Sequence, residues 1–484
     1  MDIEMNSLDK YLIEVGSPLK IALQKLDKYE EGVVFVVNKS FLIGSITHGD
    51  VRRALLNNLS LFSPVELVAN NNPIYYSEVA SPYELNMLFT NGVTRVPIID
   101  SDGKIVRVAT EESTGIIPLS EPFLTSRETE LVLQVMNSGW ISSNGIFVNE
   151  FENLFAEFTE ANFAISVCNG TQALVLALLA LGIKAEDEVI VPALTFGATA
   201  NAVIQIGATP VFADVELATM GISVESISNL ITPKTRAIIP VHLYGQSVNL
   251  GELLNFAKLN NLLVIEDCAE AIGTKFRGKH VGIESDAGTF SFYGNKTITT
   301  GEGGMVLFKE KIYADRARLI KSHGFTPEKR YWHNSWGTNF RLTNLQAAIG
   351  VAQMERIQEL VRIKQTNALH YQEGLFGLGI AFPKNFDWST NSFWLNVIFF
   401  FEGNESVEEL EYYLSISGIE TRRIFSPLPE QPAFIKYSKA NQIFPNAQLL
   451  FERGLCLPSS TTLTINQINF VVKHIEIFLE SKKS

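Results

Sequence analysis

The residue of this sequence best suited to covalent chemistry is Lys296. It follows an apolar, aromatic run from Gly288, typical of a buried strand, and it precedes the glycine-rich turn Gly301-Glu-Gly-Gly304. Burying a lysine is costly unless its charge is removed or used. A lysine with a lowered pKa is suited to forming a Schiff base with a carbonyl cofactor.

A second strand pattern, from Leu262 to Asp267, ends in the acidic pair Glu266-Asp267. A carboxylate at a strand end can pair with a protonated pyridine nitrogen, which makes the ring an electron sink. Lys296 and Asp267 together therefore predict a site for pyridoxal 5'-phosphate (PLP). Glu270 lies one helical turn after Asp267 and is expected to face the same pocket.

Three further segments suit such a cofactor, although each has an ordinary structural alternative. Gly170 and Thr171 open a helical pattern and offer backbone N–H groups and a hydroxyl to a phosphate, or they are part of a common helix cap. Ser291 lies five residues before Lys296 and can contact the phosphate, or it is a buried serine bonded to the backbone. Phe196 follows a strand end and can stack on a planar ring, although such aromatics are more often core.

The substrate contacts are predicted from residues near these segments. Arg341 in Asn339-Phe-Arg341 can hold an anionic substrate, and Asn344 can donate to a phosphate. As isolated residues, both are more often structural. The other predicted substrate contacts are Trp140, Ser142 and Arg422.

The region from residue 116 onward alternates between apolar strand patterns and helical patterns. The expected strands are Glu188–Pro192, Thr209–Asp214, Thr235–Val241 and Leu262–Asp267. Helical patterns between them include Ala198–Ile206 and Leu250–Leu259. This alternation predicts a mostly parallel sheet covered by helices, and ligands of such sheets bind at the carboxyl ends of the strands.

One long helix is expected from Asn344 towards His370. It would link the large domain, residues 116–372, to a small α+β domain, residues 373–484.

Residues 1–115 read as a separate region with an internal repeat of roughly 60 residues. The first copy is predicted to hold a helix, two strands and a helix: Ser17–Leu26, Gly32–Val37, Phe41–Ile46 and Val51–Leu56. The second holds a helix and two strands, Ser81–Phe89, Val93–Ile99 and Lys104–Val108, and is truncated after Val108. The short polar stretch 109–115 suits a linker.

The two copies resemble a pair of CBS (cystathionine β-synthase-like) modules, which often bind adenine nucleotides. Thr47 and Asp50 have the Thr-x-x-Asp spacing with which such modules hold a ribose. The second copy lacks this element, so at most one complete nucleotide site is expected. The alternative is an interaction or oligomerisation module without a ligand.

Composition excludes several classes of function. The chain has 484 residues, is 46% hydrophobic and carries a formal net charge of −13, which argues against a general nucleic-acid or anionic-membrane surface. Its three cysteines, Cys168, Cys268 and Cys456, form no disulfide framework or zinc pattern and suit a reducing cytosol. We expect no metal site. Without a signal-peptide pattern or a membrane-spanning stretch, the expected location is cytoplasmic.

Residues 116–484 resemble the sugar-nucleotide aminotransferases of the DegT/DnrJ/StrS family, which have the fold-type I architecture. The resemblance rests on six segments in the expected order: Gly139-Trp-Ile-Ser142 with Gly145, Cys168 to Leu174, Pro192 to Thr199, Glu266 to Ala271, Ser291 to Lys296 with Gly301 to Gly304, and Asn339 to Asn344.

This resemblance implies a PLP-dependent homodimer with shared active sites. Lys296 would carry the cofactor, Asp267 would face its pyridine nitrogen, and Phe196 would stack on its ring. The phosphate would be held by Gly170, Thr171 and Ser291, with Asn344 of the partner subunit. Glu270 takes a position that relatives often fill with Gln or His, so the resemblance assigns it no definite role.

The same resemblance points towards the members that aminate a GDP-linked 4-keto-6-deoxy sugar with L-glutamate as donor. The segments carrying it include Tyr331-Trp-His333 and Gly418 to Arg422. Two alternatives remain: an aminotransferase for a UDP- or dTDP-linked keto sugar, at C4 or C3, and a non-catalytic nucleotide-sensing regulator. The CBS-like pair departs from the usual single-module architecture and makes a higher oligomer conceivable.

Overall fold

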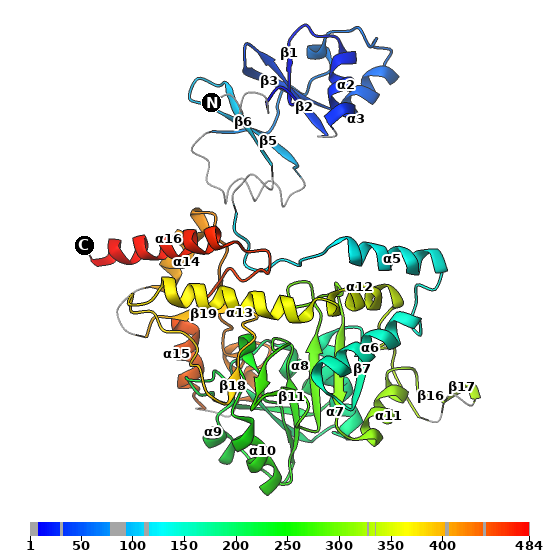
Figure 1. The fold of residues 1–484 in the computed structure, drawn as a ribbon, viewed down its shortest axis with the longest axis vertical. Helices are drawn as coiled ribbons and strands as arrows, with labels where there is room; N and C mark the ends of the chain where they lie inside the picture. The colour runs from blue at the N-terminus through cyan, green and yellow to red at the C-terminus, as the bar shows by residue number, and fades with distance from the viewer. Residues whose placement is uncertain are drawn as a thin grey trace. The chain divides into compact units, whose positions relative to one another are not determined.

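The computed structural model describes residues 8–29, 32–77, 93–110, 116–326, 329–333, 335–401, 406–438 and 442–483. Its internal contacts divide the chain into two compact units. The first comprises Met1–Ile117 with Tyr412–Glu420, and the second comprises Pro118–Glu411 with Thr421–Ser484. Figure 1 shows the course of the chain through both.

A seven-stranded sheet forms the centre of the second unit (Figure 1). Its strands, in spatial order, are β7 (Phe163–Val167), β15 (Gly304–Phe308), β14 (Ala287–Ser291), β11 (Leu263–Asp267), β10 (Thr235–Ile238), β8 (Glu188–Pro192) and β9 (Thr209–Ala213). Only β15 is antiparallel to its neighbours, and the other pairings are parallel. The prediction of a mostly parallel sheet is confirmed.

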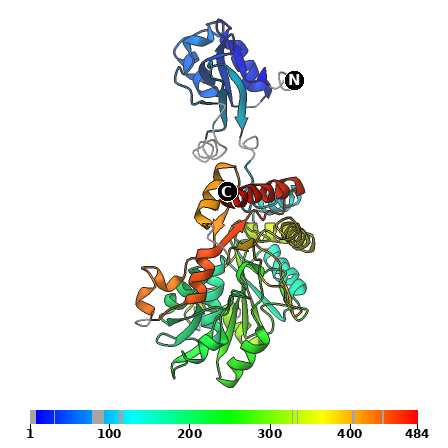
Figure 2. The ribbon, with the colours of Figure 1, turned by 90° about the vertical axis from the view of Figure 1, so that its left-hand side faces the viewer.

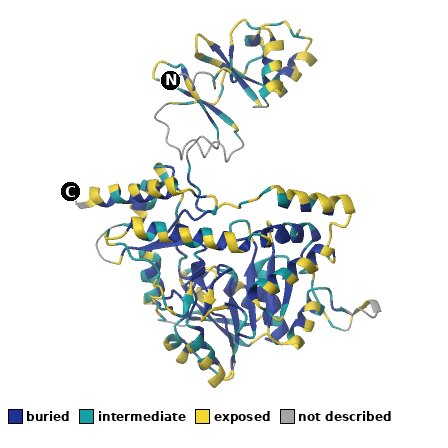
Figure 3. Ribbon diagram, viewed as in Figure 1, coloured by how far each residue is buried: buried dark blue, intermediate teal, exposed yellow. Residues whose placement is uncertain are grey.

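The strands are apolar on both faces because helices cover both faces (Figure 2). Along β8, Val189 and Val191 join one hydrophobic core, and Ile190 between them joins the other. The first core is closed by α7 (Gly170–Leu181), α8 (Ala198–Gln205) and α11 (Lys311–Ile320). The second is closed by α5 (Ser126–Ser138), α6 (Ile146–Thr159), α10 (Leu250–Leu259) and α12 (Asn344–Met354). Figure 3 shows the buried strands between helices with exposed outer faces.

The single long helix expected after Asn344 is wrong, because the segment forms two helices. α12 ends at Met354, and α13 spans Ile357–Gly374. Arg356 leaves the helical conformation with φ −118° and ψ 5°, and its guanidinium donates to the carbonyl of Phe123 at 2.8 Å. At this break, the side chain of Arg356 thus satisfies the backbone carbonyl of Phe123, which lies just before α5.

The C-terminal part of the second unit carries a small antiparallel sheet. Its strands, in spatial order, are β19 (Asn396–Phe399), β21 (Gly454–Leu457) and β20 (Arg422–Arg423). Its helices are α15 (Pro445–Arg453) and α16 (Ile465–Lys483), and α14 (Val407–Ile416) precedes β20. Shorter elements of the second unit are α9 (Val224–Ser228), β12 (Lys275–Phe276), β13 (Lys279–His280), β18 (Ser389–Thr390), and the hairpin β16 (Phe325–Thr326) and β17 (Lys329–His333).

The first unit contains two three-stranded sheets with the same topology. They are β1 (Leu12–Glu14), β2 (Val33–Asn38) and β3 (Phe41–Thr47), and β4 (Tyr76–Ser77), β5 (Arg95–Ile99) and β6 (Ile105–Thr110). In each, the first strand is parallel to the second, and the second is antiparallel to the third. The first copy also has α2 (Leu19–Tyr29) and α3 (His48–Leu56). The helix expected at 81–89 lies outside the described residues.

Across the described ranges, no helix combines the length and the apolar character needed to cross a bilayer.

Candidate active site

Lys296 lies in the turn after β14, at the carboxyl end of the sheet strands. Its backbone N–H donates to the carbonyl of Tyr293 at 2.9 Å, which fixes the turn. Its Nζ lies 3.5 Å from Oε1 of Glu270 and 3.7 Å from the ring centre of Trp394. Burial lowers the pKa of Lys296, and the negative charges of Glu270 and Asp267 act against this shift. The lowered pKa favours the unprotonated amine, which is the form that acts as a nucleophile or a base.

Asp267 is the last residue of β11 and is buried. Its Oδ2 accepts a hydrogen bond from the hydroxyl of Thr199 at 2.8 Å, and its Oδ1 accepts from the N–H of Ala269 at 3.2 Å. Burial raises the pKa of this carboxyl, whereas these hydrogen bonds and the charge of Lys296 oppose the increase. A further cation in the pocket would favour the charged carboxylate.

Glu270 is buried between Lys296 and the backbone of Tyr244. Its Oε2 accepts from the N–H of Tyr244 at 3.0 Å, and Tyr244 has the left-handed backbone angle φ 54°. Such a conformation is strained for a residue with a bulky side chain. Burial raises the pKa of Glu270 and lowers that of Lys296, so the two pKa values lie closer together and a proton can pass between the groups more easily.

Gly170 and Ser291 meet at the N-terminus of α7. A Cβ atom at Gly170 would lie 2.7 Å from the Cβ of Ser291, so only glycine fits beside this strand end. The helix is capped by Asn169, whose Oδ1 accepts from the N–H of Gln172 at 2.9 Å. The cap is therefore Asn169 and not Thr171, which lies in the first turn of the helix after Gly170. A helix N-terminus of this kind favours an anion.

Phe196 follows β8 and is 62% exposed, although its neighbours Leu194 and Thr195 are buried. Its ring centre lies 5.8 Å from that of Phe425. An exposed ring at the carboxyl end of a central strand is available to a planar ligand. The alternative of a core residue does not apply.

His242, which lies shortly after β10, has a structural role. His242 is fully buried, and its Nε2 lies 2.8 Å from Oε2 of Glu266, while its Nδ1 accepts from the N–H of Val248. Glu266 also accepts from Gly282 and Ser285. His242, Glu266 and Cys268 lie close enough to hold a metal ion, but these hydrogen bonds already occupy the carboxylate.

Asn344 does not use its side chain in this cluster. It is buried at the start of α12, where its Nδ2 donates to the carbonyl of Trp140 at 2.8 Å and its Oδ1 accepts from the N–H of Phe147 at 3.1 Å. Trp140 and Ser142 are exposed in the loop that Asn344 supports. Asn344 therefore positions this loop within its own chain.

Arg341 and Arg422, both predicted substrate residues, lie in different surroundings. Arg341 lines a cavity of about 620 Å³ with Arg318 and Lys321, and its Nε donates to Oδ1 of Asn339 at 2.8 Å. Arg422 in β20 instead lies close enough to Lys296 for its charge to lower the pKa of that lysine. One chain thus brings Arg422, but not Arg341, to Lys296.

Sequence reasoning missed three residues of the site. Thr199 bonds Asp267, Tyr244 bonds Glu270, and Trp394 lies against Lys296. Thr199 stands in the segment that contains Phe196, so its position near the site was available from the sequence. Trp394 is far along the chain, and no local pattern indicates its contact.

The sequence profile of the DegT/DnrJ/EryC1/StrS aminotransferase family matches residues 122–476. The chain belongs to this family. It is 43% identical over 366 residues to a protein named GDP-perosamine synthase from Escherichia coli O157:H7, covering 76% of this chain and 99% of that protein. It is 40% identical over 362 residues to the protein of the same name from Vibrio cholerae, covering 75% and 98%.

Two solved aminotransferase structures also resemble this chain. The aminotransferase from Psychrobacter cryohalolentis superposes with a TM-score of 0.72 at 32% identity and covers 76% of this chain and 100% of its own. The PLP form of Spr1654 from Streptococcus pneumoniae gives a TM-score of 0.71 at 26% identity, covering 76% and 99%. The present chain, as a member of the family, is a PLP-dependent aminotransferase.

The residues present fit this cofactor. The cradle of Gly170, Thr171 and Ser291 suits a phosphate, a carboxylate lies at a strand end, and a lysine with a lowered pKa lies beside it. The Oδ1 atom of Asn295, next to Lys296, is buried and has no hydrogen-bond partner among the described residues. A polar ligand in the pocket would satisfy such an atom.

Proposed function

We propose that this enzyme transfers the amino group of L-glutamate to C4 of GDP-4-keto-6-deoxymannose, forming GDP-perosamine and 2-oxoglutarate. The observation that carries this proposal is the 43% identity to the GDP-perosamine synthase of Escherichia coli, over 99% of that protein. The product would serve O-antigen or other polysaccharide biosynthesis.

Lys296 is the proposed catalytic residue. When bound, PLP supplies the electron sink that stabilises the electrons left at the substrate carbon. The amine of Lys296 takes the proton from the amino-bearing carbon of glutamate and later returns a proton to C4 of the sugar. Burial lowers the pKa of Lys296, which favours the unprotonated amine that this step needs.

Three groups would hold the cofactor in place for this proton transfer. The carboxylate of Asp267, fixed by Thr199, would keep the pyridine nitrogen protonated. The start of α7 with Ser291 would hold the phosphate, and Phe196 would cover the ring. Glu270 would take up or return a proton at the Lys296 amine, 3.5 Å away.

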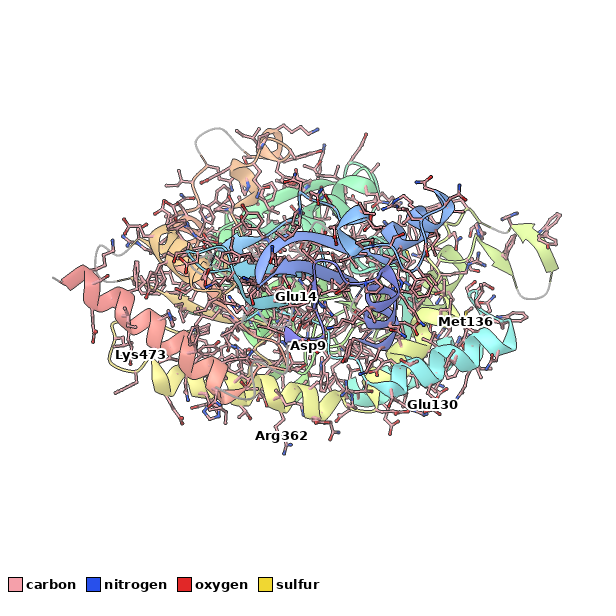
Figure 4. All side chains as sticks on the ribbon, turned by 90° about the horizontal axis from the view of Figure 1, so that it is seen from above. Asp9, Glu14, Glu130, Met136, Arg362 and Lys473 are labelled. Carbon is pink, nitrogen blue, oxygen red and sulfur yellow. The ribbon has the colours of Figure 1, made fainter. Side chains whose placement is uncertain are left out.

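The active enzyme is proposed to be a homodimer with shared sites. Supporting this, α5, the loop after it and the start of α6 expose the apolar side chains Leu133, Met136, Trp140, Ile141 and Ile146. Glu130 and Met136 are labelled on α5 in Figure 4. In this proposed dimer, Arg341 of the partner subunit would complete the site of Lys296. The β16–β17 hairpin, which extends from the body of the second unit in Figure 1, exposes Tyr331 and Trp332 and suits the same interface.

We further propose that residues 1–115 are a CBS-like pair followed by the domains 116–372 and 373–484. The repeated sheet topology supports the pair. Thr47 caps α3, and its hydroxyl donates to Oδ2 of Asp50 at 2.7 Å, while Arg53 donates to Oδ1. A ribose would have to replace these bonds, so adenine-nucleotide binding would be weak.

The first experiment is an absorbance spectrum of the PLP-loaded protein, recorded before and after L-glutamate and again after GDP-4-keto-6-deoxymannose. We expect the band of the lysine-bound cofactor, near ~410–420 nm, to disappear with glutamate and return with the sugar. Lys296→Ala should show neither change.

Two other outcomes separate the alternatives. Loss of the band with glutamate but no return with the GDP sugar would refute the substrate and direct attention to UDP- and dTDP-linked keto sugars. A band unchanged by glutamate would contradict glutamate as donor and favour the non-catalytic nucleotide sensor. Lys296 with its lowered pKa, next to Glu270, speaks against the sensor.

A further inference from the structure

Trp394 forms one wall of the space around the Lys296 amine. Its side chain is buried, and the Lys296 Nζ lies over the ring, 3.7 Å from its centre. A cation over an indole face at this distance is stabilised, because the face carries negative potential. Glu270 provides the other favourable contact, at 3.5 Å.

The indole is fixed by independent contacts. Its Nε1 donates to the carbonyl of Asn295 at 2.8 Å, the residue immediately before Lys296. Its ring stacks on Tyr244, with centres 6.1 Å apart and planes 6° apart. Tyr244 also donates its N–H to Glu270. Tyr244 therefore supports both the indole ring of Trp394 and the carboxylate of Glu270, which lie next to the Lys296 amine.

A buried lysine anchors the backbone of Trp394. The Nζ of Lys364, on α13, donates to the carbonyl of Trp394 at 3.0 Å and to that of Ser459 at 2.8 Å. Burial lowers the pKa of Lys364 to about 7. Lys364 and Lys296 both line a small cavity of about 10 Å³, which has room for roughly one water molecule. Nothing in the proposed reaction otherwise requires this lysine.

We propose that the indole face of Trp394 is the resting place of the Lys296 amine whenever that amine is not bonded to the cofactor. The indole would hold the protonated amine beside Glu270, ready for proton transfer. Lys364 is then a positioning residue that acts through Trp394. The inference rests on the proposed role of Lys296.

The test lowers the negative potential of the indole face in steps while keeping the shape of the ring. The full-length protein is produced with tryptophan carrying no, one, two or three ring fluorines and is loaded with pyridoxamine 5'-phosphate, which leaves the Lys296 amine free. Acylation of Lys296 by acetic anhydride at a fixed mildly alkaline pH is followed by peptide mass spectrometry. Fluorine withdraws electrons from the ring face, so the ammonium is less stabilised and the pKa of Lys296 falls.

We expect acylation of Lys296 to accelerate with each fluorine, severalfold and up to about tenfold over the series. The same series in Trp394→Phe should be flat. In Trp388→Phe, which removes a tryptophan packed on Phe276 and Phe386, the acceleration should persist.

The proposal is overturned if the acylation rate of Lys296 in the unmutated protein does not depend on the number of ring fluorines. It is also overturned if the rate depends on that number equally in Trp394→Phe. If Trp394→Phe does not fold, the four other single variants, Trp140→Phe, Trp332→Phe, Trp336→Phe and Trp388→Phe, decide by elimination. Loss of the slope in any of them also overturns it. Acylation needs no turnover, so a protein that shows the slope but no glutamate reaction would refute the proposed function and keep the contact.

Discussion

At the scale of single residues, the active site is a small set of charged groups that shift one another's pKa values. Lys296 is surrounded by Glu270, Asp267 and Arg422, and burial is the largest cause of its lowered pKa. The carboxylates act in the opposite direction, so removing one of them should shift the pKa of the amine further down. The proton transfer can therefore be adjusted by a change that leaves Lys296 in place.

Glu270→Gln tests this balance. The amide keeps the shape but removes a negative charge that raises the pKa of Lys296. The unprotonated amine then persists to lower pH, so the acidic limb of the glutamate half-reaction should shift to lower pH. Stopped-flow measurements of the cofactor band across pH report this limb. Glu284→Gln, in an exposed ion pair with Lys279, is the control that should leave it unchanged. A shift to higher pH would contradict the argument.

At the scale of elements, the cofactor pocket depends on the close approach of α7 to the end of β14. Gly170 permits this approach because a Cβ atom would overlap Ser291. The approach brings the N–H groups at the start of α7 beside the hydroxyl of Ser291. Neither element alone provides such a cradle.

Gly170→Ala should therefore weaken cofactor binding by roughly tenfold or more and lower the free energy of unfolding by about 1–3 kcal/mol, as expected for overpacking. Fluorescence titration of PLP and urea denaturation measure the two effects. Gly294→Ala is the matched control, because no atom of the described residues, its chain neighbours aside, lies within 4 Å of an added Cβ, and its backbone angle is ordinary. Equal PLP affinities for the two variants would refute the role of the cradle.

At the scale of the first unit, Asp50 gives a separate prediction. Its carboxylate accepts from Thr47 and Arg53, so AMP or ATP should bind weakly by replacing these bonds. Calorimetry should detect heat for the unmutated protein and none for Asp50→Ala. Identical heats for the two proteins would exclude Thr47 and Asp50 as the nucleotide site.

At the scale of the whole molecule, the predicted substrate residues fall into two groups. Arg422 acts on Lys296 within one chain, whereas Arg341 lines a separate cavity. A homodimer with shared sites would unite Arg341 of one chain with Lys296 of the other. This arrangement gives a measurable consequence when two defective proteins are mixed.

Lys296→Ala and Arg341→Ala should each be inactive or nearly so, and their mixture, after subunit exchange, should recover about a quarter of the unmutated activity. Half of the dimers would then be mixed, and each would have one intact site. Lys296→Ala mixed with Arg422→Ala is the control and should recover nothing, because both residues belong to the same chain's share of the site. Recovery in both mixtures, or in neither, would contradict shared sites.

The sequence by itself determined the class of fold and the chemical centre. Strands buried on both faces need near-continuous apolar runs, so β8, β10 and β11 stand out locally, and their carboxyl ends indicate where a ligand binds. Lys296 and Asp267 stand out because charged residues are rare beside such runs. These features are local, and local patterns are readable from one chain.

Only the tertiary structure decided which distant residues complete the site. Trp394 and Tyr244 reach Lys296 and Glu270 through the packing of separate segments, and no spacing along the chain encodes these contacts. At the break between α12 and α13, Arg356 likewise bonds the carbonyl of Phe123, over two hundred residues away in sequence. Periodicity records which face of an element is buried, but the partner it is buried against is fixed by packing alone.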